Sequence, residues 1–126
     1  MFGGKEKREQ AEKQLEDEVE RLKGLSAEQI GAELIGRVDS GGLDPDAIPV
    51  GALAKCLSPG YGRLRGPKVE EFLGLVDEGC SALEHAGLFT SVGWGGVADG
   101  NVYALSRKGR DALEAQSVAQ VLGEGP

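Results

Sequence analysis

The sequence predicts a mainly helical α+β fold with one short β hairpin near its end. Apolar residues recur at helical spacing over residues 68–84, and residues 80–113 follow as a helix end, a strand, a glycine-rich loop, a return strand and a new helix. The chain has 126 residues, 40% hydrophobic and 28% charged, which is typical of one globular domain. We therefore expect a main domain over 24–118, a charged helical arm over 1–23 and a C-terminal tail over 119–126.

Acidic and basic residues alternate in the first 23 residues, and one helical stripe there is apolar, formed by Leu15, Val19 and Leu22. Pairs of opposite charge four residues apart support an exposed helix. The stripe is shorter than the roughly three or four heptads that a stable coiled coil needs. Three interpretations stay open: the stripe docks on the domain, it pairs with a second copy of the chain, or the arm is solvated.

The first helix of the domain has a clear beginning and end. Ser26 and Gln29 have the spacing of a capping box, and the Ser-Gly-Gly run at 40–42 ends the helix. A compact second helix is expected to begin near Pro49, because proline breaks a helix interior. Residues 58–67 contain three glycines and two prolines, which predicts a loop.

The third helix carries the strongest periodic signal of the chain. Its inward positions are Val69, Phe72, Leu73, Val76, Cys80 and Leu83. We expect Gly87 to close it and the runs 88–92 and 102–105 to form the two strands of the hairpin. A last helix then begins at Ser106 and extends toward Leu122.

Three motifs in this order resemble the winged helix-turn-helix superfamily. They are Ile48-x-Val50-x-x-Leu53-Ala54-x-x-Leu57, Leu83-x-x-Ala86-Gly87-Leu88-Phe89 and Tyr103-x-Leu105-Ser106-x-Lys108-Gly109-x-x-x-Leu113. The resemblance covers residues 25–118 and implies a winged helix with a three-helix core, a two-stranded wing hairpin and extra terminal helices. In DNA-binding members the third helix lies in the major groove. The chain departs from them in the turn before this helix, which is usually three or four residues long and here has about ten.

The outward side of the third helix is acidic, and no cation follows Lys68 on it. Base reading relies on Arg, Lys, Asn and Gln, and a chain of net charge −7 is repelled by duplex DNA at long range. We therefore expect this face to contact protein, with Glu70, Asp77 and Glu78 as interface candidates.

Two aromatic residues in glycine-rich loops, Tyr61 and Trp94, are further interface candidates. Exposed aromatic side chains often anchor interfaces, but either ring can instead fold back over the domain. If the two loops lie close together, the rings form one recognition edge.

Basic residues gather in two places, before the third helix and after the hairpin: Arg63, Arg65 and Lys68, then Arg107, Lys108 and Arg110. One interpretation is a single phosphate-binding edge made of both clusters and the wing, as in a DNA-binding regulator. The other is ordinary surface charge paired with neighbouring carboxylates.

The sequence offers little catalytic or metal-binding chemistry. Cys56 and Cys80 lack metal-ligand spacing or a secretory context, and His85 is the only histidine. A Gly93-x-Gly95-x-x-Ala98 run matches a dinucleotide fingerprint only superficially, since a strand and not a helix follows it. We expect no enzyme activity, cofactor or metal.

The chain has no apolar run of about 18 residues and no signal-peptide region behind Met1. These features predict a cytoplasmic protein without a membrane partner. The function expected is a recognition module that acts mainly through protein contacts and self-associates as a dimer. The alternative is a DNA-binding transcriptional regulator that uses the basic residues.

Overall fold

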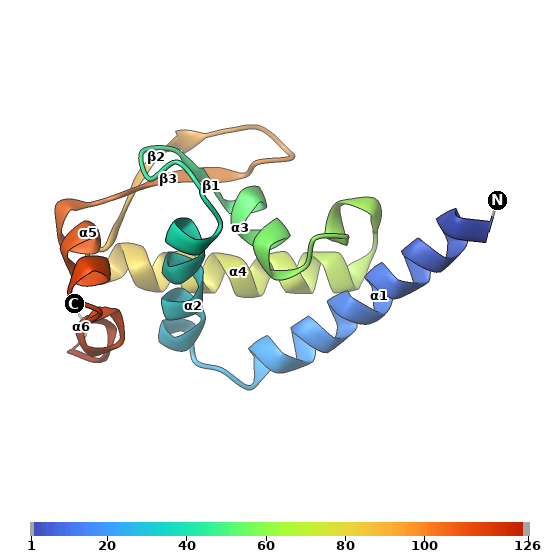
Figure 1. The fold of residues 1–126 in the computed structure, drawn as a ribbon, viewed down its shortest axis with the longest axis horizontal. Helices are drawn as coiled ribbons and strands as arrows, with labels where there is room; N and C mark the ends of the chain where they lie inside the picture. Colours follow the sequence, from blue (N-terminus) through green and yellow to red (C-terminus); the bar gives the residue numbers. More distant parts are fainter. Residues whose placement is uncertain (1, 125–126) are drawn as a thin grey trace.

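The computed structural model describes residues 2–124, which form a set of helices with a small antiparallel sheet on one side (Figure 1). The elements are α1 (Phe2–Lys23), α2 (Ala27–Ser40), β1 (Ile48–Pro49), α3 (Val50–Leu57), the 3-10 helix η1 (Tyr61–Arg63), α4 (Pro67–His85), β2 (Phe89–Trp94), β3 (Asn101–Leu105), α5 (Arg107–Glu114) and α6 (Val118–Glu124). The predicted mainly helical α+β class is confirmed. None of the helices over residues 2–124 is long and apolar enough to cross a bilayer.

Local capping signals set the helix ends as the sequence predicts. The Ser26 Oγ accepts the backbone N–H of Gln29 at 3.1 Å, and the Gln29 Oε1 accepts the N–H of Ser26 at 2.8 Å. Pro67 lies in the first turn of α4, where its missing N–H costs no hydrogen bond. Just past the end of α4, Gly87 has φ +82°, a left-handed conformation that favours glycine.

Helix α1 is part of the domain and not a separate arm. Leu15, Val19 and Leu22 are at most 2% exposed, and the helix packs on α4. Arg21 adds an ion pair to Glu33 of α2, at 2.7 Å. The docking interpretation of this stripe is therefore correct. These three residues are wrong as candidates for contact with a second copy, because their side chains are already covered.

The core is centred on the crossing of α2 and α4, where two glycines allow the helices to approach closely. A Cβ added to Gly31 would lie 2.9 Å from the carbonyl oxygen of Gly79. Phe72, Val76 and Leu83, all predicted to face inward, are fully buried on α4. This crossing fixes which side of α4 faces solvent.

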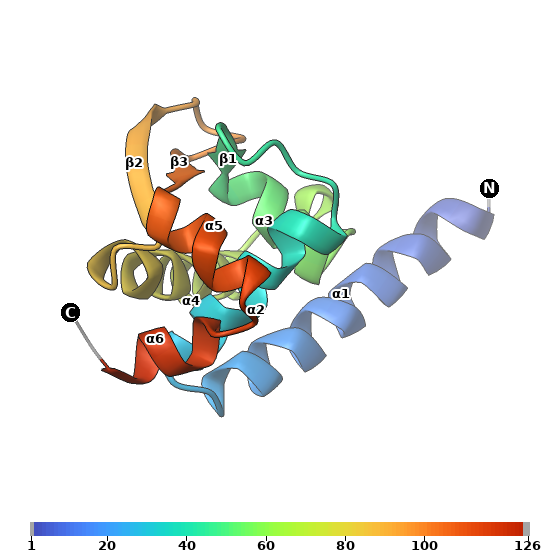
Figure 2. The same ribbon diagram turned by 60° about the vertical axis from the view of Figure 1, so that its left-hand side comes forward.

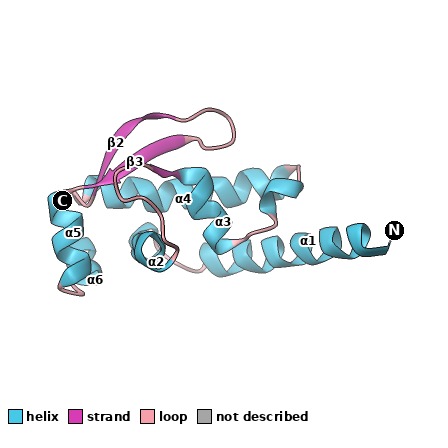
Figure 3. Cartoon of the chain, turned by 45° about the horizontal axis from the view of Figure 1, so that its top comes forward, coloured by secondary structure: helices cyan, strands magenta, loops and turns pink. Residues whose placement is uncertain are grey.

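The sheet has three strands in the order β1-β3-β2, all antiparallel (Figure 3). The sequence predicted only the hairpin of β2 and β3. Strand β1 is two residues long and pairs Ile48 with Tyr103 and Pro49 with Val102. A bulge between Ser91 and Gly93 interrupts the register of β2. The core-facing rings of Phe89 and Tyr103 lie 5.5 Å apart across the hairpin.

The predicted single C-terminal helix is wrong, because the chain turns between α5 and α6. Gln116 takes a φ of +53° at this turn. The turn brings α6 against α2 and buries Leu122 to 4% exposure (Figure 2). Residues 119–124 of the expected tail thus belong to a packed helix, α6; residues 125–126 lie outside the described part.

Candidate functional site

The loop at the tip of the hairpin, residues 95–100, is fastened to the first turn of α3. The N–H of Gly51 donates to the carbonyl oxygen of Asp99 at 2.9 Å. This bond matters because Pro49 caps α3 without a side-chain acceptor. A Cβ at Gly51 would lie 2.3 Å from the carbonyl oxygen of Ala98, so only glycine permits this approach. The hairpin loop is therefore held over α3 and α4.

Under this loop lies a groove of about 610 Å³, which we call the hairpin groove. Its lining residues come from α3, from α4, from the segment 61–65 and from the hairpin, and they include Lys55, Leu73, Asp77, Arg65, Trp94 and Val97. Tyr61 also lines it. The two glycine-rich loops thus lie close together, which was the condition for one aromatic recognition edge. The two rings nevertheless have different environments.

Tyr61 is a core residue. Its side chain is 7% exposed, its ring centroid lies 5.6 Å from that of Phe72, and its hydroxyl donates to the carbonyl oxygen of Gly51 at 3.3 Å. Burial, with a smaller contribution from the charge of Asp99, raises the pKa of the Tyr61 phenol. The prediction of Tyr61 as an exposed interface anchor is wrong, because the ring supports the floor of the groove.

Trp94, in contrast, is open to solvent. It is 68% exposed, and the only other exposed large apolar side chains in the described part are Val92 at 54% and Val97 at 98%. All three lie within six residues of the hairpin. The interpretation in which the indole folds back is wrong, and the hairpin presents a local apolar surface.

The outward face of α4 is acidic, as predicted. Glu70, Asp77 and Glu78 are exposed residues, and none of them forms an ion pair within the described part of the chain. Partial burial at the groove raises the pKa of the Asp77 carboxyl. By comparison, the neighbouring Glu71 contacts Lys23 at 3.4 Å, which lowers its pKa. Glu70, Asp77 and Glu78 therefore have no ion-pair partner among the described residues.

The two basic clusters lie at opposite ends of α4 (Figure 1). Arg63 and Arg65 precede the helix, whereas Lys108 reaches its last turn and donates to the carbonyl oxygen of Ala86 at 3.0 Å. A helix of 19 residues is roughly 28 Å long. The prediction of one phosphate-binding edge made of both clusters is wrong, because the length of α4 separates them.

Several of these cations are also engaged within the chain. Lys68 contacts Glu71 at 3.4 Å, and Arg110 donates to Asp46 at 2.6 Å. Arg63, Arg65 and Arg107 form no ion pair with the described residues. Paired surface charge thus describes Lys68 and Arg110. Lys108 is held instead by a backbone carbonyl oxygen, so only part of each cluster is left for a partner.

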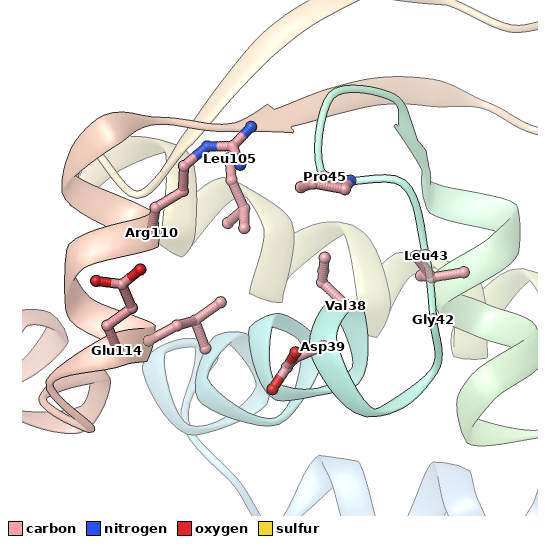
Figure 4. A pocket seen from close by; sticks show the side chains of 9 residues that line it. Val38, Asp39, Gly42, Leu43, Pro45, Leu105, Arg110 and Glu114 are labelled. Atoms are coloured by element: carbon pink, nitrogen blue, oxygen red, sulfur yellow. The ribbon is translucent and has the colours of Figure 1, made fainter.

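A second hollow, of about 470 Å³, lies between α2, α5 and the segment before β1 (Figure 4). Val38 and Leu105 are its buried residues, and Leu43, Pro45 and Leu113 complete an apolar wall. No pattern in the sequence predicts this hollow, because its lining comes from segments that are far apart along the chain.

The two thiols and the histidine differ in their exposure. Cys80 is buried, and burial, followed by the charges of Asp77 and Glu84, raises the pKa of its thiol to about 12. Cys56 is half-buried and also unpaired. His85 is exposed at the end of α4. Among residues 2–124, no three acidic, cysteine or histidine side chains lie together as a metal site would require.

Comparison with known proteins assigns this chain to no family. No protein-family model, no curated protein and no solved structure matches it. Its function is therefore inferred from the geometry and charge of the hairpin groove and of α4.

Proposed function

We propose that this chain is a non-enzymatic recognition module that binds a protein partner through the hairpin groove and the acidic face of α4. One observation carries the proposal. Two exposed apolar side chains of the hairpin, Trp94 and Val97, line the same groove as Asp77. Asp77 belongs to a helix face whose carboxylates form no ion pair within the described residues. Protein interfaces combine an apolar, often aromatic anchor with a charged rim that selects the partner. The expected partner therefore presents an apolar side chain flanked by basic residues.

We also propose a winged-helix scaffold, in which α2, α3 and α4 form the three-helix core and β2 and β3 form the wing. The order of these elements along the chain supports the proposal. In that scaffold, α4 would take the place of the helix that reads DNA in DNA-binding members. Its acidic surface favours a polypeptide over a polyanion at this position.

The test is selection of binders from a displayed library of random peptides, followed by calorimetric titration of the synthesised peptides. We expect the selected peptides to carry an apolar residue flanked by basic residues. Trp94→Ala and Asp77→Lys should each weaken binding at least about tenfold, the effect of losing an interface hot spot. Asp111→Lys is the matched control, because Asp111 is exposed on α5 outside the groove. Selected peptides that bind both variants as tightly as the wild-type chain would contradict the proposal.

DNA binding is the second candidate, and the unpaired Arg63 and Arg65 beside the hairpin groove favour it. A fluorescently labelled duplex of random sequence, titrated at low and moderate salt, separates the two. Our proposal predicts no appreciable affinity even at low salt. Salt-dependent affinity that Arg63→Ala and Arg65→Ala both reduce would favour the regulator instead.

A further inference from the structure

Strand β2 is an open edge of the sheet. In the order β1-β3-β2 its inner side pairs with β3, and no other described strand pairs with its outer side. Figure 2 shows it at the outer rim of the molecule. Residues 90–94 are all exposed. An edge of this kind is a template for pairing with another chain.

The backbone groups that this edge offers follow from the hydrogen bonds at its base. The N–H of Ser106 donates to the carbonyl oxygen of Leu88 at 3.0 Å, which marks these two residues as a hydrogen-bonded pair. Such pairs alternate along an antiparallel ladder, so Phe89 and Ser91 direct their N–H and C=O groups away from β3. Consistently, the N–H of Leu105, opposite Phe89, donates to a residue outside the hairpin.

This edge lacks two of the common protections against pairing, charged residues and proline. Edge strands are commonly guarded by charged residues or proline, yet no Asp, Glu, Lys or Arg occurs over residues 86–98, and β2 contains no proline. Its only irregularity is the bulge between Ser91 and Gly93. Because each copy has a net charge of −7, the electrostatic repulsion between two copies is smallest where no carboxylates face each other. The longest run without a charged residue in this chain lies over β2.

We propose that β2 pairs antiparallel with β2 of a second copy, across a two-fold axis near Ser91, and joins the two sheets into one. An isologous contact of this kind uses the same strand of both copies. The assembly closes at two, because the opposite edge of each sheet is the two-residue β1, which contains Pro49. The inference extends the proposed function by naming one partner, and it concerns the edge of β2 and not the face of α4.

Sedimentation equilibrium of the full chain tests the pairing. A single added strand pair is a small interface, so we expect a monomer–dimer equilibrium with a dissociation constant of roughly micromolar size. Ser91→Glu and Ser91→Lys should each raise that constant at least about tenfold, since like charges then meet at the axis. An equimolar mixture of the two variants should dimerise again. Ser81→Glu, exposed on α4, should leave the equilibrium unchanged.

Hydrogen exchange on the wild-type chain gives a readout that does not depend on how the variants fold. The amide of Ser91 should exchange more slowly as protein concentration rises through the dimer transition. A chain that stays monomeric, a dimer that neither Ser91 variant weakens, or an open series of oligomers would each overturn the pairing. The Asp77→Lys variant should still dimerise but lose peptide binding, whereas the Ser91→Lys variant should still bind peptide but lose dimerisation. Failure of either proposal is thereby recognised separately.

Discussion

Two glycines on α4 provide a matched test of how closely α2 and α4 pack. A Cβ added to Gly79 would lie 2.6 Å from Cγ2 of Ile30 and 2.8 Å from Cδ1 of Leu34. A Cβ added to Gly74, on the exposed side of the same helix, meets no atom within 4 Å. The variants Gly79→Ala and Gly74→Ala therefore differ mainly in the space around the new methyl group.

The expected magnitude follows from two opposing effects. Replacing glycine by alanine inside a helix stabilises it by about 1 kcal/mol, and this gain is common to both variants. Overpacking a close-packed core costs about 1–3 kcal/mol, and it applies only to Gly79→Ala. The free energy of unfolding should thus be about 1–3 kcal/mol lower for Gly79→Ala than for Gly74→Ala. For a chain of this size the melting temperatures should differ by at least about 4 °C.

Thermal and urea unfolding, followed by the helical circular dichroism signal, measure this difference. Gly74→Ala should melt above the wild-type chain and Gly79→Ala at or below it. Leu34→Ala provides room beside Gly79, so the cost of Gly79→Ala should shrink when the two changes are combined. Equal stability of the two alanine variants would refute the close crossing of α2 and α4.

Three further predictions concern buried or partly buried groups. In the native chain a thiol reagent should modify Cys56 far faster than Cys80. The pKa of the Cys80 thiol is raised from 9.0 to about 12, which lowers its thiolate fraction about 1000-fold. Equal reaction rates would contradict the burial of Cys80. Asp77→Asn should raise the melting temperature at neutral pH but not at about pH 3. The raised pKa of Asp77 means that its protonated form favours the fold, and this contribution is lost as the pH rises through the raised pKa. An equal change in melting temperature at both pH values would exclude this cause. Leu22→Ala should cost about 2–5 kcal/mol in urea unfolding, the usual range for a buried leucine, whereas a solvated arm would lose almost nothing.

Features of the fold that are encoded in neighbouring residues could be predicted from the sequence. The capping box at Ser26 and the left-handed glycine after α4 need only a few adjacent side chains, and both are confirmed. The inward face of α4 was also predicted, because its apolar residues repeat with the period of the helix. Local geometry alone decides these features.

Features that depend on distant partners could not be predicted in the same way. Strand β1 is too short to show a pattern and exists because Ile48 pairs with Tyr103, more than fifty positions away. The turn at Gln116 carries no glycine or proline signal, and the packing of Leu122 on the distant α2 accompanies it. The apolar stripe of α1 looked the same whether it faced the domain, a second copy or solvent.

The same distinction between local features and features that depend on distant residues applies to the candidate site. Exposure of the acidic face of α4 agrees with the prediction from the sequence, because helical periodicity acts locally. For Trp94 the sequence left two interpretations open, and the structure has the exposed one. Tyr61 has similar glycine neighbours and is nevertheless buried, because its ring packs against Phe72 and its hydroxyl donates to the carbonyl oxygen of Gly51. The joint basic edge was wrong even though the separating helix was predicted, because one cluster precedes the first turn of α4 and the other reaches its last turn.

The attachment of the hairpin links the fold to the proposed recognition. The first turn of α3 has backbone N–H groups without helical acceptors, and the carbonyl oxygen of Asp99 satisfies the one at Gly51. The loop that carries Val97 is thereby held in place by a requirement of α3 itself, and the β2–β3 ladder holds Trp94 at its other end. A partner that binds these side chains pays less conformational entropy than it would on a free loop. The tethering of these exposed apolar residues therefore supports the proposal that the hairpin is a binding surface.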